Sequence, residues 1–168
     1  MMDIYISGDT IKLTPMKKED LSMINLWYHQ IDSYGYATAG KNPEEVLAGL
    51  NNENTGFVLG IYPAGTESCI GLIAGEIKSI REPVLWVRTF LIDAHWQRMH
   101  YGSTAFQLLS EYITRNLHIK RFFVSVAIKN RVGAAFWKSL GFRCIKLFFG
   151  SSGHSSSAYI FEKVIQLQ

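Results

Sequence analysis

Apolar residues before Asn51 predict a strand followed by two helices. The strand is predicted over Ile4–Leu13, with a turn or kink at Gly8 and Asp9. After Pro15, apolar residues recur at helical spacing and predict a helix from Lys18 to His29, with Leu21, Ile24 and Tyr28 on its apolar face. A second, shorter helix is predicted over Pro43–Leu50.

After Asn51 the pattern changes to runs that are rich in β-branched and aromatic residues. Three such runs follow one another, namely Thr55–Tyr62, Cys69–Ile80 and Val84–Ile92. Turn-like segments separate them, Pro63-Ala64-Gly65 first and Arg81-Glu82-Pro83 second. Strands joined by short turns pair side by side, so this part of the chain predicts an antiparallel meander.

A helical period then returns over Gly102–Asn116. Its apolar face is formed by residues at i, i+3, i+4, i+7 and i+8, namely Ala105, Leu108, Leu109, Tyr112 and Ile113. The continuous apolar run Phe122–Ile128 that follows is typical of a strand buried on both faces. A strand, a helix and a strand in this order predict a right-handed parallel crossover.

The last elements are a helix and a hairpin. The helix is predicted over Val132–Leu140 and ends at Gly141, which stands in the position of a helix C-cap. Cys144–Phe149 and Ala158–Val164 predict a hairpin around the Ser-rich loop Gly150–Ser157. The fold class is therefore α+β: one domain over residues 1–168, with a mixed, mostly antiparallel sheet, a βαβ unit and flanking helices.

Composition agrees with one globular domain. The 168 residues are 48% hydrophobic and 18% charged, which is enough apolar surface to offset the entropy of folding. Apolar runs are far shorter than the roughly 20 residues of a membrane span, and Met1–Gly8 has no secretory pattern, so we expect a cytoplasmic protein without membrane contact. Cys69 and Cys144 lack CxxC spacing and are expected to be buried, reduced thiols.

Charge is distributed unevenly along the chain. Residues 1–93 carry 7 Lys/Arg and 12 Asp/Glu, a net charge of −5, whereas residues 94–168 carry 10 and 2, a net charge of +8. No carboxylate side chain lies between Glu111 and Glu162. This half of the chain therefore favours a polyanionic ligand, either a nucleic acid or a small phosphorylated cofactor.

The segment Phe90–Ala105 is a predicted strand that turns directly into a helix near Gly102. A helix N-terminus presents unpaired N–H groups and a partial positive charge, which stabilise a bound phosphate. Arg98 adds a full positive charge, and no acidic residue lies between Asp93 and Glu111. The alternative is a plain helix start at which Gln97, Arg98 and His100 are solvated.

Two motifs in this half resemble those of the GNAT superfamily of N-acetyltransferases. The segment from Gln97 to Ser103 resembles its Q/R-x-x-G-x-G/A loop, and the segment from Asn130 to Phe142 resembles its N-x-x-A-x-x-F/L-Y-x-x-x-G-F motif. The element order is similar along nearly the whole chain. Ile11–Leu26 with Trp27 is similar to the branch that contains ribosomal-protein and polyamine acetyltransferases.

The resemblance implies that acetyl-CoA is the co-substrate and that an amine is acetylated by direct attack in a ternary complex. It implies that the backbone of one strand pairs with the pantetheine arm, at Phe90, Leu91 and Ile92. The loop after Gln97 would hold the pyrophosphate through backbone N–H groups of Arg98, Met99, His100, Tyr101, Gly102 and Ser103. The other side of the site would be lined by Asn130, Ala134, Phe136 and Trp137.

Two departures of the sequence from the family pattern matter for the proposed chemistry. His100 replaces the earlier glycine of the loop, so that position must tolerate a side chain, which either contacts phosphate or lies exposed. Trp137 stands where the family has the tyrosine that acts as general acid, and an indole N–H is not an acid near neutral pH. No tyrosine acid is therefore assigned. A thiol of pKa about 8.5 can leave as its thiolate.

Glu76 is the best candidate for the general base, because it lies in an apolar strand where burial would raise its pKa. A solvent-facing carboxylate, an ion pair with Arg88 and deprotonation through water are the alternatives. Tyr34, Tyr36 and Asp32 are candidates for an acceptor site, since aromatic faces and carboxylates attract ammonium groups. The acceptor is a small-molecule or protein amine.

Two other classes of protein remain as alternatives. One is a catalytically silent sensor of the same fold that binds acyl-CoA, which Trp137 and His100 favour. The other is a nucleic-acid-binding domain, which is disfavoured because the aromatic residues fall at core spacings and no helix is rich in Lys and Arg. No metal is expected, since His29, His95, His118 and His154 are scattered. A homodimer is compatible with the resemblance.

Overall fold

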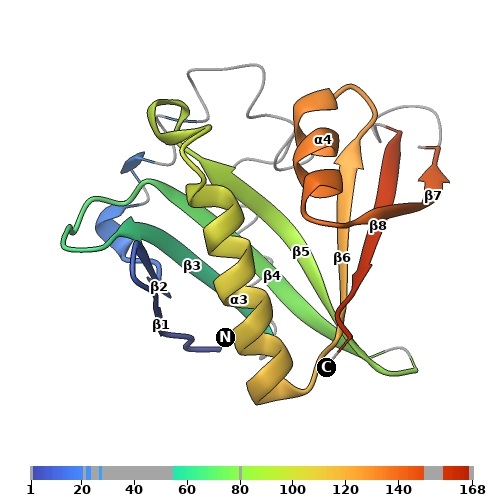
Figure 1. Ribbon diagram of the computed structural model, residues 1–168, viewed down its shortest axis with the longest axis horizontal. Coiled ribbons are helices and arrows are strands. Elements are labelled where there is room, and N and C mark those ends of the chain that lie inside the picture. The colour runs from blue at the N-terminus through green and yellow to red at the C-terminus, as the bar shows by residue number, and fades with distance from the viewer. Residues whose placement is uncertain are drawn as a thin grey trace.

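A computed structural model describes residues 2–20, 22, 23, 27, 55–79, 81–149 and 157–166. All its strands form one sheet in the order β1-β2-β3-β4-β5-β6-β8-β7 (Figure 1). The strands are β1 Ile6–Ser7, β2 Ile11–Pro15, β3 Gly56–Pro63, β4 Gly71–Ser79, β5 Pro83–Ile92, β6 Arg121–Ala127, β7 Arg143–Phe148 and β8 Ala158–Val164. Of the paired strands described, only β5 and β6 run parallel, so the predicted α+β class with a mostly antiparallel sheet is confirmed.

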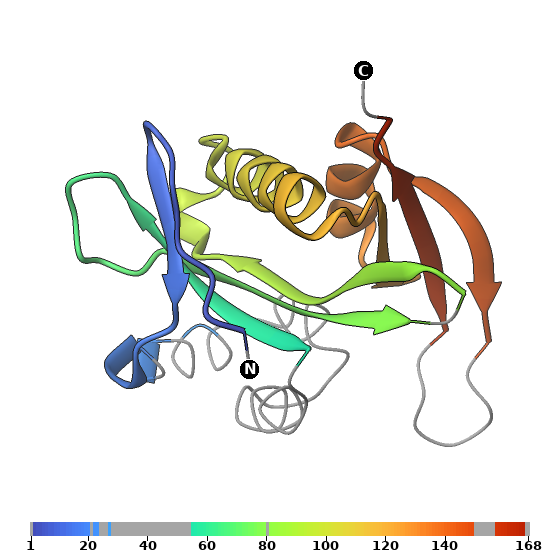
Figure 2. The ribbon, with the colours of Figure 1, turned by 90° about the horizontal axis from the view of Figure 1, so that it is seen from below.

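Two α-helices of the described residues lie on one face of this sheet, and the 3-10 helix η1 (Lys18–Asp20) lies on the other (Figure 2). The helices are α3 (Tyr101–Leu117) and α4 (Arg131–Ser139), close to the predicted bounds. The predicted apolar face of α3 enters the core, where Ala105, Leu109 and Ile113 are fully buried. A crossover from β5 through α3 to the parallel strand β6 confirms the βαβ unit.

Several predictions of the N-terminal half concern residues outside the described part of the chain. The predicted helix Lys18–His29 is described only at η1 and at residues 22, 23 and 27, which are helical. The predicted helix Pro43–Leu50 and the acceptor-site candidates Tyr34, Tyr36 and Asp32 lie outside the described residues, as does most of the loop Gly150–Ser157. No helix that the structure describes is long and apolar enough to cross a membrane.

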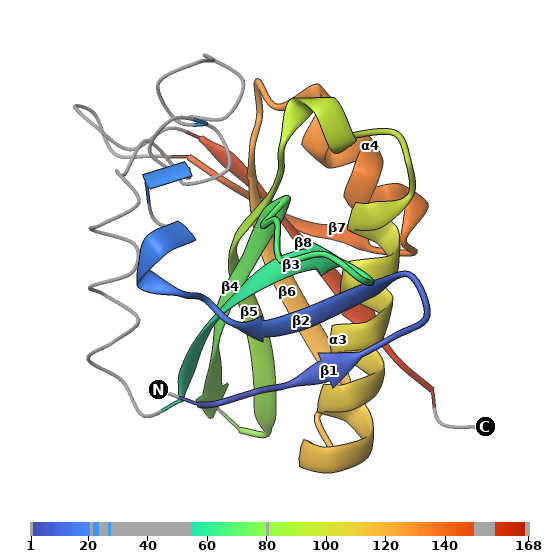
Figure 3. The same ribbon diagram turned by 90° about the vertical axis from the view of Figure 1, so that its left-hand side faces the viewer.

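A buried hydrogen bond fixes η1 against the sheet. The Tyr62 hydroxyl, on β3, donates to Asp20 Oδ2 over 2.6 Å. Burial and this bond to a carboxylate raise the pKa of Tyr62, so the phenol keeps its proton. Figure 3 shows η1 beside the edge that β1 and β2 form, opposite α3.

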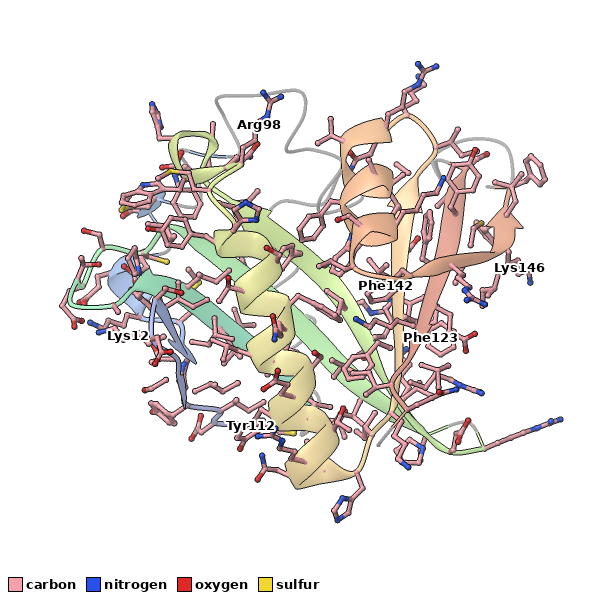
Figure 4. All side chains as sticks on the ribbon, in the orientation of Figure 1. Lys12, Arg98, Tyr112, Phe123, Phe142 and Lys146 are labelled. Carbon is pink, nitrogen blue, oxygen red and sulfur yellow. The ribbon has the colours of Figure 1, made fainter. Side chains whose placement is uncertain are left out.

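The prediction that β6 is buried on both faces is wrong. Phe122, Val124 and Val126 are buried, whereas Phe123 is half-buried and Ser125 is exposed. The apolar run continues through Phe123 because that ring, labelled in Figure 4, stacks on Trp86 of β5 at 5.5 Å between centroids. An unbroken apolar run can therefore arise from one core face and one aromatic pair.

The prediction of two buried thiols is correct for Cys69 and wrong for Cys144, which is exposed. Cys144 lies on β7, the last strand of the sheet, and every side chain of β7 is exposed. An edge strand has a neighbour on one side only, so apolar residues on it are not buried by default.

A β-bulge at Arg88 shapes the sheet near the predicted cofactor strand. Ala74 pairs with Thr89 and Gly75 pairs with Val87, so Arg88 is an extra residue in β5. The parallel pairing of β5 with β6 stops at Val87, although β5 continues to Ile92. Past the bulge the two strands separate, and no strand that the structure describes pairs with β5 on that side.

The register of β4 and β5 around the bulge shows which side chains lie on each face of the sheet. Phe90 and its register partner Ile73 pack on the core beneath α3, so the adjacent pair, Thr89 and Ala74, points to the opposite face. We call this opposite face the second face of the sheet. Alternation along the strands places further residues on it, including Leu72, Glu76 and Trp86.

Gly71 is expected to be essential for the packing of β4 on β5. A Cβ at this position would collide with the Leu91 carbonyl oxygen, which is backbone, and would lie 2.8 Å from Ile92 Cδ1. Gly71→Ala should therefore lower the unfolding free energy by about 2 to 3 kcal/mol and the thermal midpoint by several degrees.

Gly102→Ala is the matched control, because its Cβ would lie at ordinary contact distances of 3.4 to 3.5 Å from Phe136 and Ile92. It should leave the midpoint unchanged or raise it, since alanine favours a helix. Equal midpoints for the two variants in thermal unfolding would contradict the expected collision.

Candidate active site

A cleft of about 840 Å³ opens where β5 and β6 separate. Its walls come from the end of β5, the loop through the 3-10 helix η3 (Ala94–Trp96), the N-terminus of α3, the end of β6 and one side of α4. Arg98 lines the cleft, and Figure 4 shows its side chain above the start of α3. Of the described lining residues, four are cationic, namely Arg88, Arg98, Lys129 and Arg131, and none is Asp or Glu.

The structure brings most of the predicted cofactor-binding residues together in this cleft. Those that line it are Phe90, Leu91, Ile92, Gln97, Arg98, His100, Gly102, Ser103, Asn130, Phe136 and Trp137. Met99, Tyr101, Ala134 and Glu76 do not line it. Met99 is exposed, Tyr101 packs edge-on against Trp96 at 5.5 Å between centroids, and Ala134 packs against the core.

The first turn of α3 has backbone N–H donors to which the side chain of the N-cap residue does not bond. His100 is the N-cap residue, and its side chain makes no capping hydrogen bond. The first-turn N–H groups of Tyr101, Gly102 and Ser103 have no partner within a helix, and no acidic residue lies in this turn. An anion placed here would be bound by these donors and by Arg98.

Two residues of the loop adopt left-handed backbone angles without being glycine. Arg98 has φ 60° and His100 has φ 64°. This conformation costs an L-residue about 1 to 2 kcal/mol, and it is the conformation that the missing family glycine would adopt freely. Gln97 Nε2 donates to the Ile92 carbonyl over 2.8 Å, which ties the loop back to the end of β5. The loop is thus held in shape although His100 replaces a glycine.

The opposite wall is organised by the N-cap of α4. Asn130 Oδ1 accepts a hydrogen bond from the Gly133 N–H over 2.8 Å. A Cβ at Gly133 would lie 2.5 Å from Asn130 Nδ2, so the close cap uses the absence of a side chain there. Lys129 and Arg131 flank the cap and line the cleft.

Sequence reasoning missed several lining residues, among them Arg88, Thr89, Ser125, Lys129, Arg131 and Gly133. The spacing of the second motif was a signal for Gly133, since the small residue of N-x-x-A stands three positions after Asn130. The concentration of positive charge after residue 93 was a signal for Lys129 and Arg131. Nothing in the sequence marked Thr89 as a lining residue, because the direction of its side chain depends on the register of β5.

Comparison with known sequences decides the family. The model of the acetyltransferase (GNAT) domain matches residues 13–152, which is most of the chain. The chain belongs to the GNAT acetyltransferase family. It is accordingly an acyltransferase of the N-acetyltransferase class. A search of curated proteins found no match to this chain.

Solved structures of GNAT proteins share the fold. A Salmonella typhimurium acetyl transferase that modifies the N-terminal serine of 50S ribosomal subunit protein L7/L12 has a TM-score of 0.78 at 13% identity, over 97% of this chain and 100% of that chain. Spermidine N-acetyltransferase from Vibrio cholerae, solved with CoA and spermine, has a TM-score of 0.73 at 16% identity, over 94% and 96%. A GNAT acetyltransferase from Bacillus anthracis has a TM-score of 0.77 at 15% identity, over 96% of this chain and 98% of that chain.

Trp137, at the tyrosine position of the GNAT motif, is the centre of an aromatic cluster. Its ring lies 5.5 Å from Phe90, 5.4 Å from Phe106 and 5.0 Å from Phe142 between centroids, and the residue is 5% exposed. The cluster packs α4 against β5 and α3. Phe90 contributes its side chain to this packing, which leaves its backbone at the cleft.

The end of α4 is also held in place. The helix ends one residue before the predicted C-cap: Leu140 is the C-cap, and Gly141 follows it with φ 86°, a left-handed angle that glycine adopts freely. Lys163 Nζ, on β8, donates to the Leu140 carbonyl over 2.7 Å, and burial lowers the pKa of Lys163. The turn at Gly141 and the hydrogen bond from Lys163 together fix the end of α4, which forms one wall of the cleft.

Glu76, the predicted base, is buried on the second face at 5% exposure. It forms a very short ion pair with Arg88, and Lys78 Nζ lies 3.3 Å from Glu76 Oε1. Both the expected burial and the alternative pairing with Arg88 are therefore observed. Arg88 lines the cleft and Glu76 does not, so Glu76 is connected to the cleft through the residue of the bulge.

The cleft residues fit acetyl-CoA. A pantetheine arm needs unpaired backbone N–H and C=O groups, which β5 offers past the bulge. Phosphates need hydrogen-bond donors and positive charge, which the start of α3 and the lining cations Arg98, Lys129 and Arg131 supply.

Proposed function

We propose that this GNAT protein transfers the acetyl group of acetyl-CoA to a primary amine in a ternary complex. The observation that supports this most is the cleft itself, which combines a strand edge that no described strand pairs with, a helix N-terminus and the cations Arg98, Lys129 and Arg131, with no carboxylate among the described lining residues. Holding two reactants in one cleft turns a bimolecular reaction into an effectively unimolecular one.

Each wall of the cleft has a binding role in this proposal. The backbone of Phe90, Leu91 and Ile92 pairs with the pantetheine arm, and the N–H groups at the start of α3 hold the pyrophosphate together with Arg98. Lys129 and Arg131 are placed to attract the 3′-phosphate. Acetyl-CoA supplies an activated acetyl group whose thiol, of pKa about 8.5, leaves as a thiolate.

Proton removal from the amine is assigned to Glu76, directly or through water. Glu76 is the carboxylate that is buried next to the bulge, and its ion pair with Arg88 connects it to the cleft. A backbone N–H near the end of β5 stabilises negative charge on the acetyl oxygen. No side chain is assigned as general acid, because Trp137 has only an indole N–H at the tyrosine position.

The acceptor is a primary amine of a small molecule or a protein. Fold neighbours named for an N-terminal serine and for spermidine make a polyamine and a peptide with N-terminal serine the first amines to test. We propose a single cytoplasmic domain over residues 1–168, compatible with a homodimer. A sensor that binds acyl-CoA without turnover is the second candidate, favoured by Trp137 in place of the tyrosine.

Calorimetric titration with acetyl-CoA, and separately with CoA that lacks its 3′-phosphate, tests the cofactor site. We expect micromolar binding of acetyl-CoA and about tenfold weaker binding of the dephospho form, because a charged hydrogen bond to Lys129 or Arg131 is lost. No detectable heat at millimolar ligand would contradict both candidates. Thiol release with spermine, spermidine and a peptide with N-terminal serine then separates the enzyme from the sensor.

A further inference from the structure

Among the described residues, two buried side-chain atoms that could form hydrogen bonds have no partner. They are Trp86 Nε1 and Thr89 Oγ1, both on β5. Thr89 is 2% exposed and lines the cleft, whereas Trp86 does not line it. A buried hydroxyl without a partner is costly, and beside a cleft a bound ligand can supply the missing hydrogen bond.

Other buried hydroxyls of the described chain are bonded. Thr114 Oγ1, on α3, donates to the Ile119 carbonyl over 3.1 Å, and Ser110 Oγ donates to the Gln107 carbonyl over 2.9 Å. Both residues are buried to a similar degree as Thr89. The lack of a partner at Thr89 is therefore a property of its place in the sheet and not of threonine in this fold.

Thr89 follows the bulge directly and points to the second face of the sheet. The donors at the start of α3 and the wall made by α4 belong to the other face, where the phosphates and the pantetheine arm are expected. Glu76 shares the second face with Thr89, and its partner Arg88 precedes Thr89 in the chain. An amine bound in the part of the cleft that Thr89 lines would therefore lie next to Arg88, the partner of Glu76.

We propose that the Thr89 hydroxyl binds the acceptor amine and orients it for attack. The hydroxyl oxygen accepts one N–H of the neutral amine, which leaves the nitrogen lone pair free to face the acetyl group. No covalent bond to Thr89 forms, and the proton of the amine leaves as in the proposed function. The inference rests on that function and adds the residue that positions the primary amine, because the N–H held by Thr89 fixes the direction of the nitrogen lone pair.

Thr89→Val and Thr89→Ser test this assignment, since valine keeps the shape without the hydroxyl and serine keeps the hydroxyl. With the amine from the thiol-release panel that reacts fastest, Thr89→Val should lower kcat/KM at least tenfold, and Thr89→Ser should stay within threefold of the wild type. Calorimetry should give both variants a Kd for acetyl-CoA within twofold of the wild type, because the phosphate donors are unchanged.

Thermal unfolding without ligand gives a second, independent measurement. Thr89→Val should unfold at the same temperature as the wild type or higher, because it removes a hydroxyl that has no partner. Thr114→Val is the matched control and should lower the midpoint by about 2 to 4 °C, because it breaks the bond to Ile119.

The inference is wrong if Thr89→Val keeps kcat/KM within twofold of the wild type, if serine does not restore it, or if Thr89→Val loses as many degrees as Thr114→Val. These outcomes require an active wild-type protein. A wild type that binds acetyl-CoA but acetylates no amine of the panel contradicts the proposed function itself, and the assignment of Thr89 falls with it.

Discussion

Ser103→Asp is expected to weaken acetyl-CoA binding at least a hundredfold while leaving the protein as stable as the wild type. Ser103 lines the cleft in the first turn of α3, where the proposed pyrophosphate site lies. A carboxylate about 4 Å from a phosphate charge is repelled by about 4 kcal/mol at an effective dielectric constant of 20, more than the 2.7 kcal/mol of a hundredfold change.

The same carboxylate favours the helix. Negative charge in the first turn of a helix stabilises it by about 0.3 to 1 kcal/mol, and no acidic residue occupies this turn in the wild type. The thermal midpoint without ligand should therefore stay or rise slightly. Affinity and stability are expected to move in opposite directions, which a variant that merely unfolds cannot produce.

Ser103→Ala is the control for Ser103→Asp. It removes only the hydroxyl, which donates to the His100 carbonyl over 2.8 Å at an exposed position. Titration calorimetry should find its Kd for acetyl-CoA within about threefold of the wild type, since the loss of one exposed hydrogen bond is small. An aspartate variant that binds acetyl-CoA as tightly as the alanine variant would place the phosphates elsewhere.

Glu76→Gln is expected to lower kcat about a hundredfold or more with little change in the Kd for acetyl-CoA. General base catalysis contributes about 10² to 10⁴ in rate, and glutamine keeps the shape of the side chain without its ability to take a proton. Some loss of stability should accompany the change, because Arg88 and Lys78 lose their buried anionic partner. Steady-state thiol release and calorimetry measure the two constants.

Glu67→Gln is the matched control for Glu76→Gln. Glu67 also pairs with two cations, Lys12 over 2.6 Å and Lys17 over 2.8 Å, but it is exposed and does not line the cleft. Hydrogen bonds from Lys12 and Lys17 lower the pKa of Glu67 to about 2, so its charge is constant across any assay pH. Its kcat should equal that of the wild type. A kcat for Glu76→Gln within fivefold of the wild type would favour deprotonation by water.

Local patterns in the sequence were sufficient for most of the described elements and for part of the candidate site, although the single strand predicted over Ile4–Leu13 is a hairpin of β1 and β2. The spacing of Ala105, Leu109 and Ile113 predicted α3, and Gly141 marked the end of α4. Helical period, glycine placement and motif spacing are properties of neighbouring residues, so they can be read without knowing the fold. The loop from Gln97 to Ser103 belongs to this class, because a strand that leads into a helix already implies its donors.

The tertiary structure decided what depends on residues far apart in the chain. Whether Cys144 is buried depends on the position of β7 at the edge of the sheet, and the left-handed backbone of His100 depends on the loop around it. The bulge at Arg88 separates β5 from β6, pairs Arg88 with Glu76 and turns Thr89 to the second face. Strand register alternates side chains between faces, so one extra residue reverses every direction beyond it. The sequence by itself therefore determined which residues form the loop that leads into α3, and only the pairing of strands decided which side chains meet in the cleft.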